Sequence, residues 1–276
     1  MNTEPNEESS FLKSGVKLTP IYLLSIFIGI LVFIASIYSI LNPAEIYPTE
    51  AMHQMFFAND VVNLVIGLPL LLGSLWLSSR GKLLGLLFWP GALMYVLYNY
   101  IAYLFSSPLS WIYLIYMVLV SACVYTLIGL FTQIDVENVS AQLFGSIPEK
   151  LSGGVILGLG ALNFLRVLFM ITRALINQSS IATTDLSVLL ADFLLSPAWI
   201  IGGVLLLRRK ALGYVSGLAL LFQASMLFIG LIVFLALQPL LTDAPFAIVD
   251  ILVVFLMGMI CFIPFGMYIR KIGFSI

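Results

Sequence analysis

"GGVILGLGALNFLRVLFMITRALI", residues 153–176, is apolar enough to cross a bilayer, yet it contains Arg166 and Arg173. A membrane-spanning helix needs about 20 mostly apolar residues. An arginine at the centre of such a helix costs about 2.5–3.5 kcal/mol, so intramembrane arginines usually face a bundle interior and find partners there. The segment therefore predicts a membrane helix that belongs to a larger helical bundle.

The composition of the whole chain agrees with a membrane location. Of its 276 residues, 62% are hydrophobic and 9% are charged, whereas soluble domains are about 45–50% apolar and 25% charged. The formal net charge of −1 offers no basic surface, so no nucleic-acid partner is expected. We predict an all-α integral membrane protein surrounded by membrane lipid.

Apolar segments bounded by polar or turn-rich breaks predict a bundle of about eight transmembrane helices in a single domain, residues 20–269. The spans are about 20–41, 59–78, 83–105, 111–131, 153–176, 187–207, 213–237 and 246–269. Pro69 and Pro264 fall inside spans, where they indicate kinks and not boundaries. Residues 1–19 are expected to form a flexible cytoplasmic tail, and residues 270–276 a cytoplasmic C-terminal tail.

The basic residues predict the orientation, because cytoplasmic loops carry an excess of Lys and Arg. If the N-terminus is cytoplasmic, ten of the twelve basic residues fall on the cytoplasmic side, and the other two are Arg166 and Arg173. The ten are Lys13, Lys17, Arg80, Lys82, Lys150, Arg208, Arg209, Lys210, Arg270 and Lys271. We therefore predict that this is a protein of the cell membrane and that both of its termini are cytoplasmic.

Two segments of the chain are similar to each other. Residues 69–85, "PLLLGSLWLSSRGKLLG", align with residues 197–213, "PAWIIGGVLLLRRKALG", at one constant offset. The matches are Pro69/Pro197, Arg80/Arg208, Lys82/Lys210, Leu84/Leu212 and Gly85/Gly213. A duplication of four spans would give 4+4 parallel repeats. Basic cytoplasmic loops also explain the Arg and Lys matches without common ancestry, so both interpretations stay open.

The ionisable residues of the spans gather toward the outer side of the membrane. At 1.5 Å per residue, Arg166 lies about 20 Å and Arg173 about 30 Å from the cytoplasmic helix end. On the same scale Asp192, Asn99, Asp60 and Asp250 lie at about 22 to 28 Å. The inner half of the spans is almost purely apolar. This distribution predicts a polar pocket that opens outward and is closed inward.

The two arginines share one stripe of their helix with Asn163, so we expect them to face the same neighbour. By depth, Asp192 is the best partner for Arg166, and Asp60 or Asp250 for Arg173. Arg173 could also extend to the interface. The other candidate ligand-binding residues are Asn63, Asn99, Asn163 and Tyr95. The alternative is an ion-pair and amide network that fixes helix register and binds nothing.

Motifs for metal, nucleotide or nucleophile chemistry do not occur in the sequence. His53 is the only histidine, and its spacing from Glu45 and Glu50 matches no metal template. No P-loop, HExxH or GxSxG motif is present. Cys123 and Cys261 lie in apolar runs, where cysteine acts as a small buried hydrophobe. We predict no metal, no cofactor and no catalytic residue.

Three functions remain open from the sequence. The first is binding or transport of a small polar, anionic or zwitterionic molecule, with Arg166 as the anion contact. The second is a membrane enzyme that acts on a lipid headgroup at the outer leaflet, with Asp60, Asp192 or Asp250 as acid–base groups. The third is a non-catalytic accessory protein that assembles with a membrane-protein partner or with itself. The apolar inner half favours binding over transport.

Overall fold

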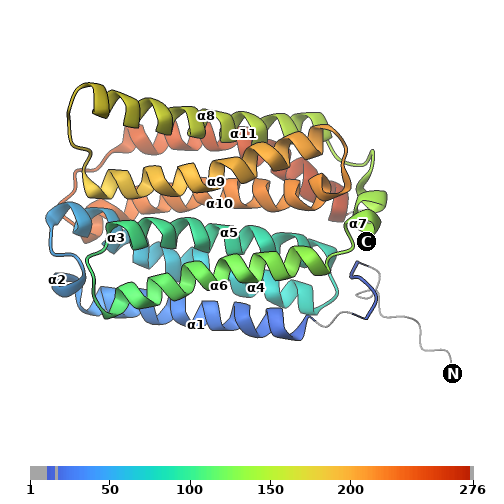
Figure 1. Ribbon diagram of the computed structural model, residues 1–276, viewed down its shortest axis with the longest axis horizontal. Coiled ribbons are helices and arrows are strands. Elements are labelled where there is room, and N and C mark those ends of the chain that lie inside the picture. Colours follow the sequence, from blue (N-terminus) through green and yellow to red (C-terminus); the bar gives the residue numbers. More distant parts are fainter. Residues whose placement is uncertain (1–10, 16–17, 274–276) are drawn as a thin grey trace.

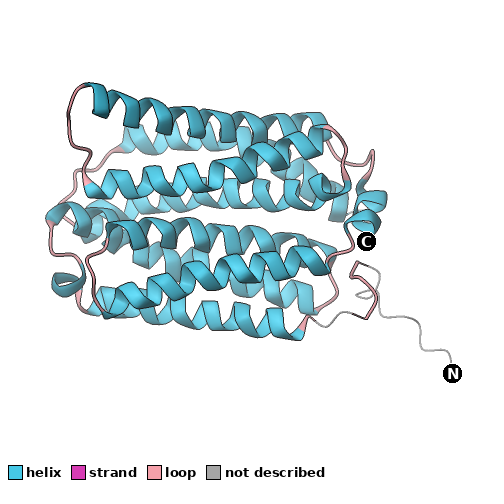
Figure 2. Ribbon diagram, viewed as in Figure 1, coloured by secondary structure: helices cyan, strands magenta, loops and turns pink. Residues whose placement is uncertain are grey.

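The computed structural model describes residues 11–15 and 18–273, and these are largely helical (Figures 1 and 2). No strand occurs in this part of the chain, where Leu12 and Ile134 form an isolated bridge. The helices are α1 (Thr19–Leu41), α2 (Pro43–Ile46), α3 (Glu50–Val62), the π-helix η2 (Asn63–Gly67), α4 (Leu68–Ser79), α5 (Leu83–Ser106), α6 (Trp111–Gln133), α7 (Val136–Leu143), α8 (Glu149–Ile176), α9 (Thr183–Leu207), α10 (Ala211–Leu241) and α11 (Ile248–Gly273).

Eight helical segments of the described chain are long and apolar enough to cross a membrane, as the sequence predicts. The second of these segments is Glu50–Ser79, in which α3, η2 and α4 form one continuous helix of 30 residues. The others are α1, α5, α6, α8, α9, α10 and α11. This composition and length identify the chain as a multi-pass, all-α membrane protein.

The second span begins nearer the N-terminus than the sequence pattern indicates, at Glu50 and not at 59. Thr49 caps its first turn, since the Thr49 hydroxyl accepts from Met52 N at 3.3 Å. Residues 50–58 include polar side chains that break the apolar pattern, but the helix is continuous through them. The π turn lies directly before Pro69, whose ring excludes normal hydrogen bonding to the preceding turn.

At both ends of the described chain, ordered residues lie beyond the expected spans. Lys13 N donates to Gln133 O at 3.0 Å, which fastens the segment before α1 to the end of α6. Lys17 and residues 1–10, part of the expected tail, lie outside the described residues. At the other terminus, α11 continues to Gly273.

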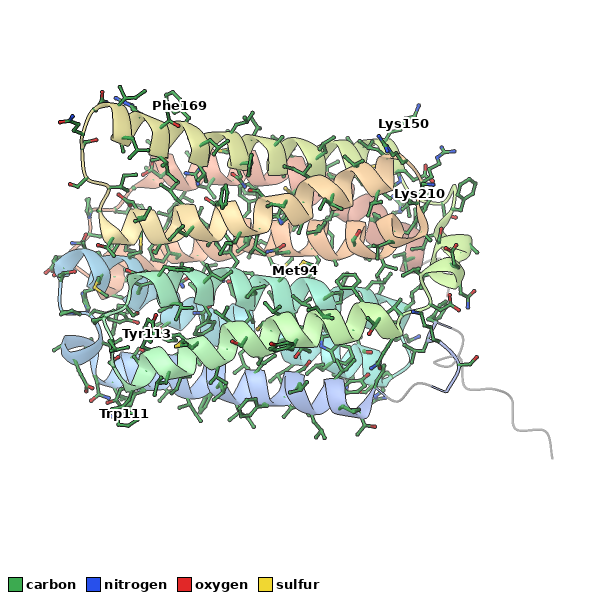
Figure 3. The ribbon with its side chains drawn as sticks, viewed as in Figure 1. Met94, Trp111, Tyr113, Lys150, Phe169 and Lys210 are labelled. Atoms are coloured by element: carbon green, nitrogen blue, oxygen red, sulfur yellow. The ribbon has the colours of Figure 1, made fainter. Side chains whose placement is uncertain are left out.

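The spans form two groups of four: α1, α3–α4, α5 and α6 in one, and α8 to α11 in the other (Figure 1). Consecutive spans pack together within each group, and the first span also contacts the fourth. The groups meet where α5 packs on α9 and α10, and where α3 packs on α10. Helix α5 is consequently the central helix, and Met94 of α5 lies near the middle of Figure 3.

The similar segments 77–85 and 205–213 form the same turn between helices. Gly81 has φ 72° and Arg209, at the equivalent position, has φ 54°. The glycine that ends each segment lets the next helix pack on the previous one, because an added Cβ would lie 2.2 Å and 2.5 Å from the nearest backbone atom. The α4–α5 and α9–α10 connections therefore share their local geometry as well as their residues.

Glycines bring α8 and α9 into close contact. A Cβ on Gly203 of α9 would lie 2.6 Å from Leu157 N of α8, and one on Gly160 of α8 would lie 2.8 Å from a side chain of α9. Small residues allow membrane helices to approach closely, as the glycine-rich start of α8 predicts. Gly158 lies on another face of α8 and has no neighbour within 4 Å.

We expect Gly203→Ala to lower the unfolding temperature of the purified protein in detergent. The methyl group forces α8 and α9 apart, and such overpacking costs about 1–3 kcal/mol. Gly158→Ala is the matched control, because its methyl group enters open space and alanine favours helix by roughly 0.5–1 kcal/mol. Similar unfolding temperatures for the two variants would show that this contact does not hold the helices together.

Candidate functional site

Two polar centres lie within the helix bundle, and α5 contributes to both. The first, the paired centre, consists of Arg166 of α8, Asp192 of α9 and Tyr98 of α5. The second, the tyrosine cage, consists of Asp60 of α3 and the phenols around it, which are Tyr47, Tyr100, Tyr103 and Tyr116. Both centres lie toward the end of the bundle that carries the α8–α9 connection.

Arg166 and Asp192 form an ion pair, which confirms the partner predicted from depth. Arg166 donates from Nη2 to Oδ2 of Asp192, and Tyr98 donates its hydroxyl to Oδ1 at 3.1 Å. The stacked rings of Phe164 and Phe193, with centroids 5.3 Å apart, hold α8 against α9 beside the pair. The side chain of Asp192 is 8% exposed, whereas that of Arg166 is 49% exposed.

This difference in exposure determines what the paired centre can do. A guanidinium carries five N–H donors, which match carboxylate and phosphate groups in pairs. Arg166 uses one terminal nitrogen for Asp192, and its side chain as a whole is half exposed, so the other donors of the guanidinium are not taken up by this contact. The paired centre can therefore accept a second anionic group without breaking the first contact.

The tyrosine cage encloses the Asp60 carboxyl group, which is 1% exposed. Tyr47 donates to one of its oxygens, and Tyr103 donates to the other at 3.0 Å. The rings of Tyr100 and Tyr116 pack against Tyr103, with centroids 5.4 and 5.3 Å away. No Lys, Arg or His forms an ion pair with Asp60 in the part of the chain that the structure describes.

Tyr47 lies outside the spans, in the connection between α1 and α3, and closes the cage from that side. Its side chain is buried, with 4% of the residue exposed. Burial, followed by the neighbouring Asp60 carboxyl, raises the pKa of Tyr47 well above its ordinary value. The phenol therefore keeps its proton and acts as a donor.

Amides extend the cage along α5. Asn59 donates to Asn99 Oδ1 and to the Tyr103 hydroxyl, both at 3.2 Å, and Asn99 donates to Tyr95 O at 2.9 Å. Asn63, one turn beyond Asp60, is 2% exposed, and its Nδ2 has no hydrogen-bond partner. Of the predicted candidates, Asp60, Asn63, Asn99 and Tyr95 thus lie in or beside the cage.

Arg173 and Asp250 belong to neither centre, so the expected pairing of Arg173 with Asp60 or Asp250 is wrong. Both residues are exposed, and neither forms an ion pair within residues 11–15 and 18–273. Asp60 faces α5 and α6 inside the first group of helices, whereas Arg173 lies near the end of α8, a peripheral helix of the second. Asn163 is half-buried and has no hydrogen bond to either centre.

The other polar features have structural partners. At the opposite end of the bundle, Glu149 forms an ion pair with Arg209 at 3.3 Å and accepts from the Tyr214 hydroxyl at 3.0 Å. His53 stacks on Phe57, with centroids 4.9 Å apart. No group of His, Cys, Asp and Glu suited to a metal ion occurs among the described residues. Cys123 and Cys261 are buried and unbonded, as predicted.

Sequence reasoning missed the phenols of both centres. Tyrosines near a membrane interface commonly act as anchors, so their position alone does not indicate a role inside the bundle. Tyr103 continues the row formed by Tyr95 and Asn99 at intervals of four residues, and this row was a usable signal. Tyr47 lies in a connection without periodicity, so no signal in the sequence placed it beside Asp60.

A small cavity of about 10 Å³ lies away from both centres, among Phe11, Leu18, Ser78 and Lys82.

Comparison with known proteins adds no relative, since no family model, no curated protein and no solved structure matches the chain. The two polar centres are therefore the basis on which a function can be assigned.

Replacing Arg166 alone should destabilise the protein more than replacing Arg166 and Asp192 together. Arg166→Leu leaves the buried Asp192 carboxylate without its cation, which costs roughly 1–3 kcal/mol. Arg166→Leu with Asp192→Leu removes both charges and should largely restore the unfolding temperature. Arg173→Leu, at an exposed arginine without an ion pair, should change stability by less than about 0.5 kcal/mol. Equal damage from the single and double variants would reject the pairing.

Proposed function

We propose that this protein binds a small polar molecule with an anionic group at the paired centre, from the outer side of a cell membrane. The half-exposed side chain of Arg166, which bonds Asp192 through one terminal nitrogen, carries this proposal. An arginine within a span attracts an anion strongly because little water competes for its donors. Asp192, which also accepts from Tyr98, holds the guanidinium in place and so prepares it for the ligand.

The apolar inner half of the spans favours binding, whereas the position of the paired centre between the two groups of helices is the observation in favour of transport. Tyr98 comes from the first group, and Arg166 and Asp192 from the second. Other polar contacts across this junction are the hydrogen bonds from Gln223 to Met94 O at 3.1 Å and from Gln238 to Gln54 O at 3.0 Å. A ligand at Arg166 would act on this junction, along which one group can rock against the other.

The two groups are proposed to be 4+4 parallel repeats. The similar turns of 77–85 and 205–213 support this relation. Gly91 and Ala219 are equivalent positions, because each follows its turn at the same distance along the chain. Their contact also supports the relation, since a Cβ on Gly91 would lie 2.4 Å from Ala219 O. Equivalent residues meet in this way where a two-fold axis passes between two repeats.

A lipid headgroup is the second candidate ligand, because the environment of Arg166 on α8 is open to lipid. Leu162 and Leu165, within the turn before Arg166, are 67% and 61% exposed, and Phe169 is 65% exposed. These side chains would lie among acyl chains. A phosphate that reaches Arg166 could therefore belong to a soluble molecule or to a lipid.

A thermal-unfolding screen of the purified protein tests the proposed function. The panel contains phosphate, carboxylates, amino acids and sulfonates in detergent, and anionic or zwitterionic lipids in nanodiscs. A ligand at 100 times its dissociation constant stabilises the protein by about 2.7 kcal/mol. We expect a soluble anion to raise the unfolding temperature of the wild type but not of Arg166→Gln.

Arg173→Gln is the matched control for this screen, because it removes an equally charged residue of the same helix and should retain the response. A response from lipids alone would identify the headgroup as the ligand. No response from either panel would refute the proposed function and favour an accessory role with a protein partner.

Both termini are proposed to be cytoplasmic. Lys150 and Lys210, like the other basic connections, lie at one end of the bundle, opposite Trp111 and Tyr113 (Figure 3). The basic end of a membrane protein faces the cytoplasm.

Single cysteines can test this orientation, since native Cys123 and Cys261 are both 0% exposed and should not react. In intact cells, a membrane-impermeant maleimide should label Ser179→Cys, in the α8–α9 connection. It should label Gln142→Cys, in α7, only after lysis. The reverse pattern would invert the topology.

A further inference from the structure

The tyrosine cage contains an intramembrane acid that the proposed anion site does not use. The ion pairs Arg166–Asp192 and Arg209–Glu149 do not involve Asp60. An ionised carboxylate that is buried without a cation costs several kcal/mol. Acids in this situation within membrane spans commonly belong to proton or ion pathways. The cage therefore needs a small positive occupant.

The groups that face Asp60 from each packed element carry no positive charge. The connection before α3 contributes Tyr47, and α5 contributes Tyr103 together with Tyr100 behind it. From α1, Ser36 lies 3.4 Å from the Tyr100 hydroxyl, and Ser39 lies 3.5 Å from that of Tyr116 on α6. Cys123 of α6 is buried nearby, and α10 meets α3 through the neutral Gln238. The titratable groups around Asp60 are thus phenols and one thiol, and His53 of α3 lies beyond Tyr47, with ring centroids 6.4 Å apart.

The geometry favours a proton over a metal ion. A metal ion needs several oxygen lone pairs directed at one point, with room for the ion between them. In the cage the hydroxyls of Tyr47 and Tyr103 direct their hydrogens at the carboxyl oxygens, and aromatic rings fill the space around them. A proton needs no such space.

We propose that Asp60 is a proton-binding site, distinct from the paired centre and closed toward the α1–α3 connection by Tyr47. A carboxylate oxygen of Asp60 forms an O–H bond with a proton taken from water and returns that proton to water on release, which changes the charge of the site by one. Asn63, one helical turn from Asp60, has a buried Nδ2 without a hydrogen-bond partner, so a second polar group of this region is also unsatisfied. The π turn that begins at Asn63 is a backbone feature frequent at functional sites.

In this proposal, Tyr47 controls the access of water to the Asp60 carboxyl group. Tyr47 and the adjacent Ile46 are 4% and 3% exposed, so the connection between α1 and α3 covers the carboxyl group. Proton exchange therefore requires this connection to move. Helix α2, which precedes Tyr47, is a single turn of four residues and can move independently of the long spans.

Infrared difference spectroscopy of the purified protein tests the proposal, with a step from about pH 6, where exposed carboxyl groups are already ionised, to alkaline buffer without an added ligand. We expect the carbonyl band of one protonated carboxylic acid to disappear while carboxylate bands appear. Asp60→Asn, which preserves the shape of the side chain, should lack this change. Asp192→Asn should retain it, which excludes the buried carboxyl group of the paired centre as its source.

Tyr47→Phe provides a second variant that does not depend on the folding of Asp60→Asn. Loss of one donor to the carboxylate should move the midpoint of the same band toward alkaline pH, and an unchanged midpoint would contradict the role of Tyr47. An identical titrating band in Asp60→Asn, or no titrating band in the wild type, would overturn the proton site.

A band that disappears on adding Na⁺ or K⁺ at constant pH would also overturn it, in favour of a metal ion. The measurement contains no anionic ligand, so its outcome is separate from that of the anion screen.

Discussion

A phenol or amide buried in lipid has no water to bond, so helix α5 can occupy the centre of this bundle only if its polar side chains meet partners on neighbouring helices. Tyr98 meets Asp192 on α9, Tyr103 meets Asp60 on α3, and Asn99 meets Asn59. These contacts fix α5 in rotation and draw both groups of helices onto it. Both polar centres form where polar side chains of α5 find these hydrogen-bond partners.

Features that depend on position along a single helix could be predicted from the sequence. A run of about 20 apolar residues identifies a membrane helix regardless of its neighbours, which explains why the eight segments were recovered. The constant rise of a helix converts residue number into depth, and equal depth matched Arg166 with Asp192. The glycines at the start of α8 indicated close packing, and Gly160 achieves it against α9.

Features that depend on rotation about the helix axis, or on polar residues inside a helix, could not be predicted in this way. Arg166 and Arg173 share a stripe, but α8 lies at the edge of the bundle, so one arginine reaches α9 and the other is exposed. The first turns of α3 are too polar for a hydropathy criterion, yet they are helical because Thr49 caps them. Tyr47 reaches Asp60 through a connection whose path no periodic pattern encodes.

The pairing of Arg166 with Asp192 also constrains how the chain is made. Arg166 is synthesised before Asp192, and an unpaired arginine makes insertion of α8 less favourable by about 2.5–3.5 kcal/mol. Its partner arrives with the next helix, whose glycine packs directly on the backbone of α8. Helices α8 and α9 are therefore expected to leave the translocation machinery as a preassembled hairpin, with α8 retained there until α9 has been translated.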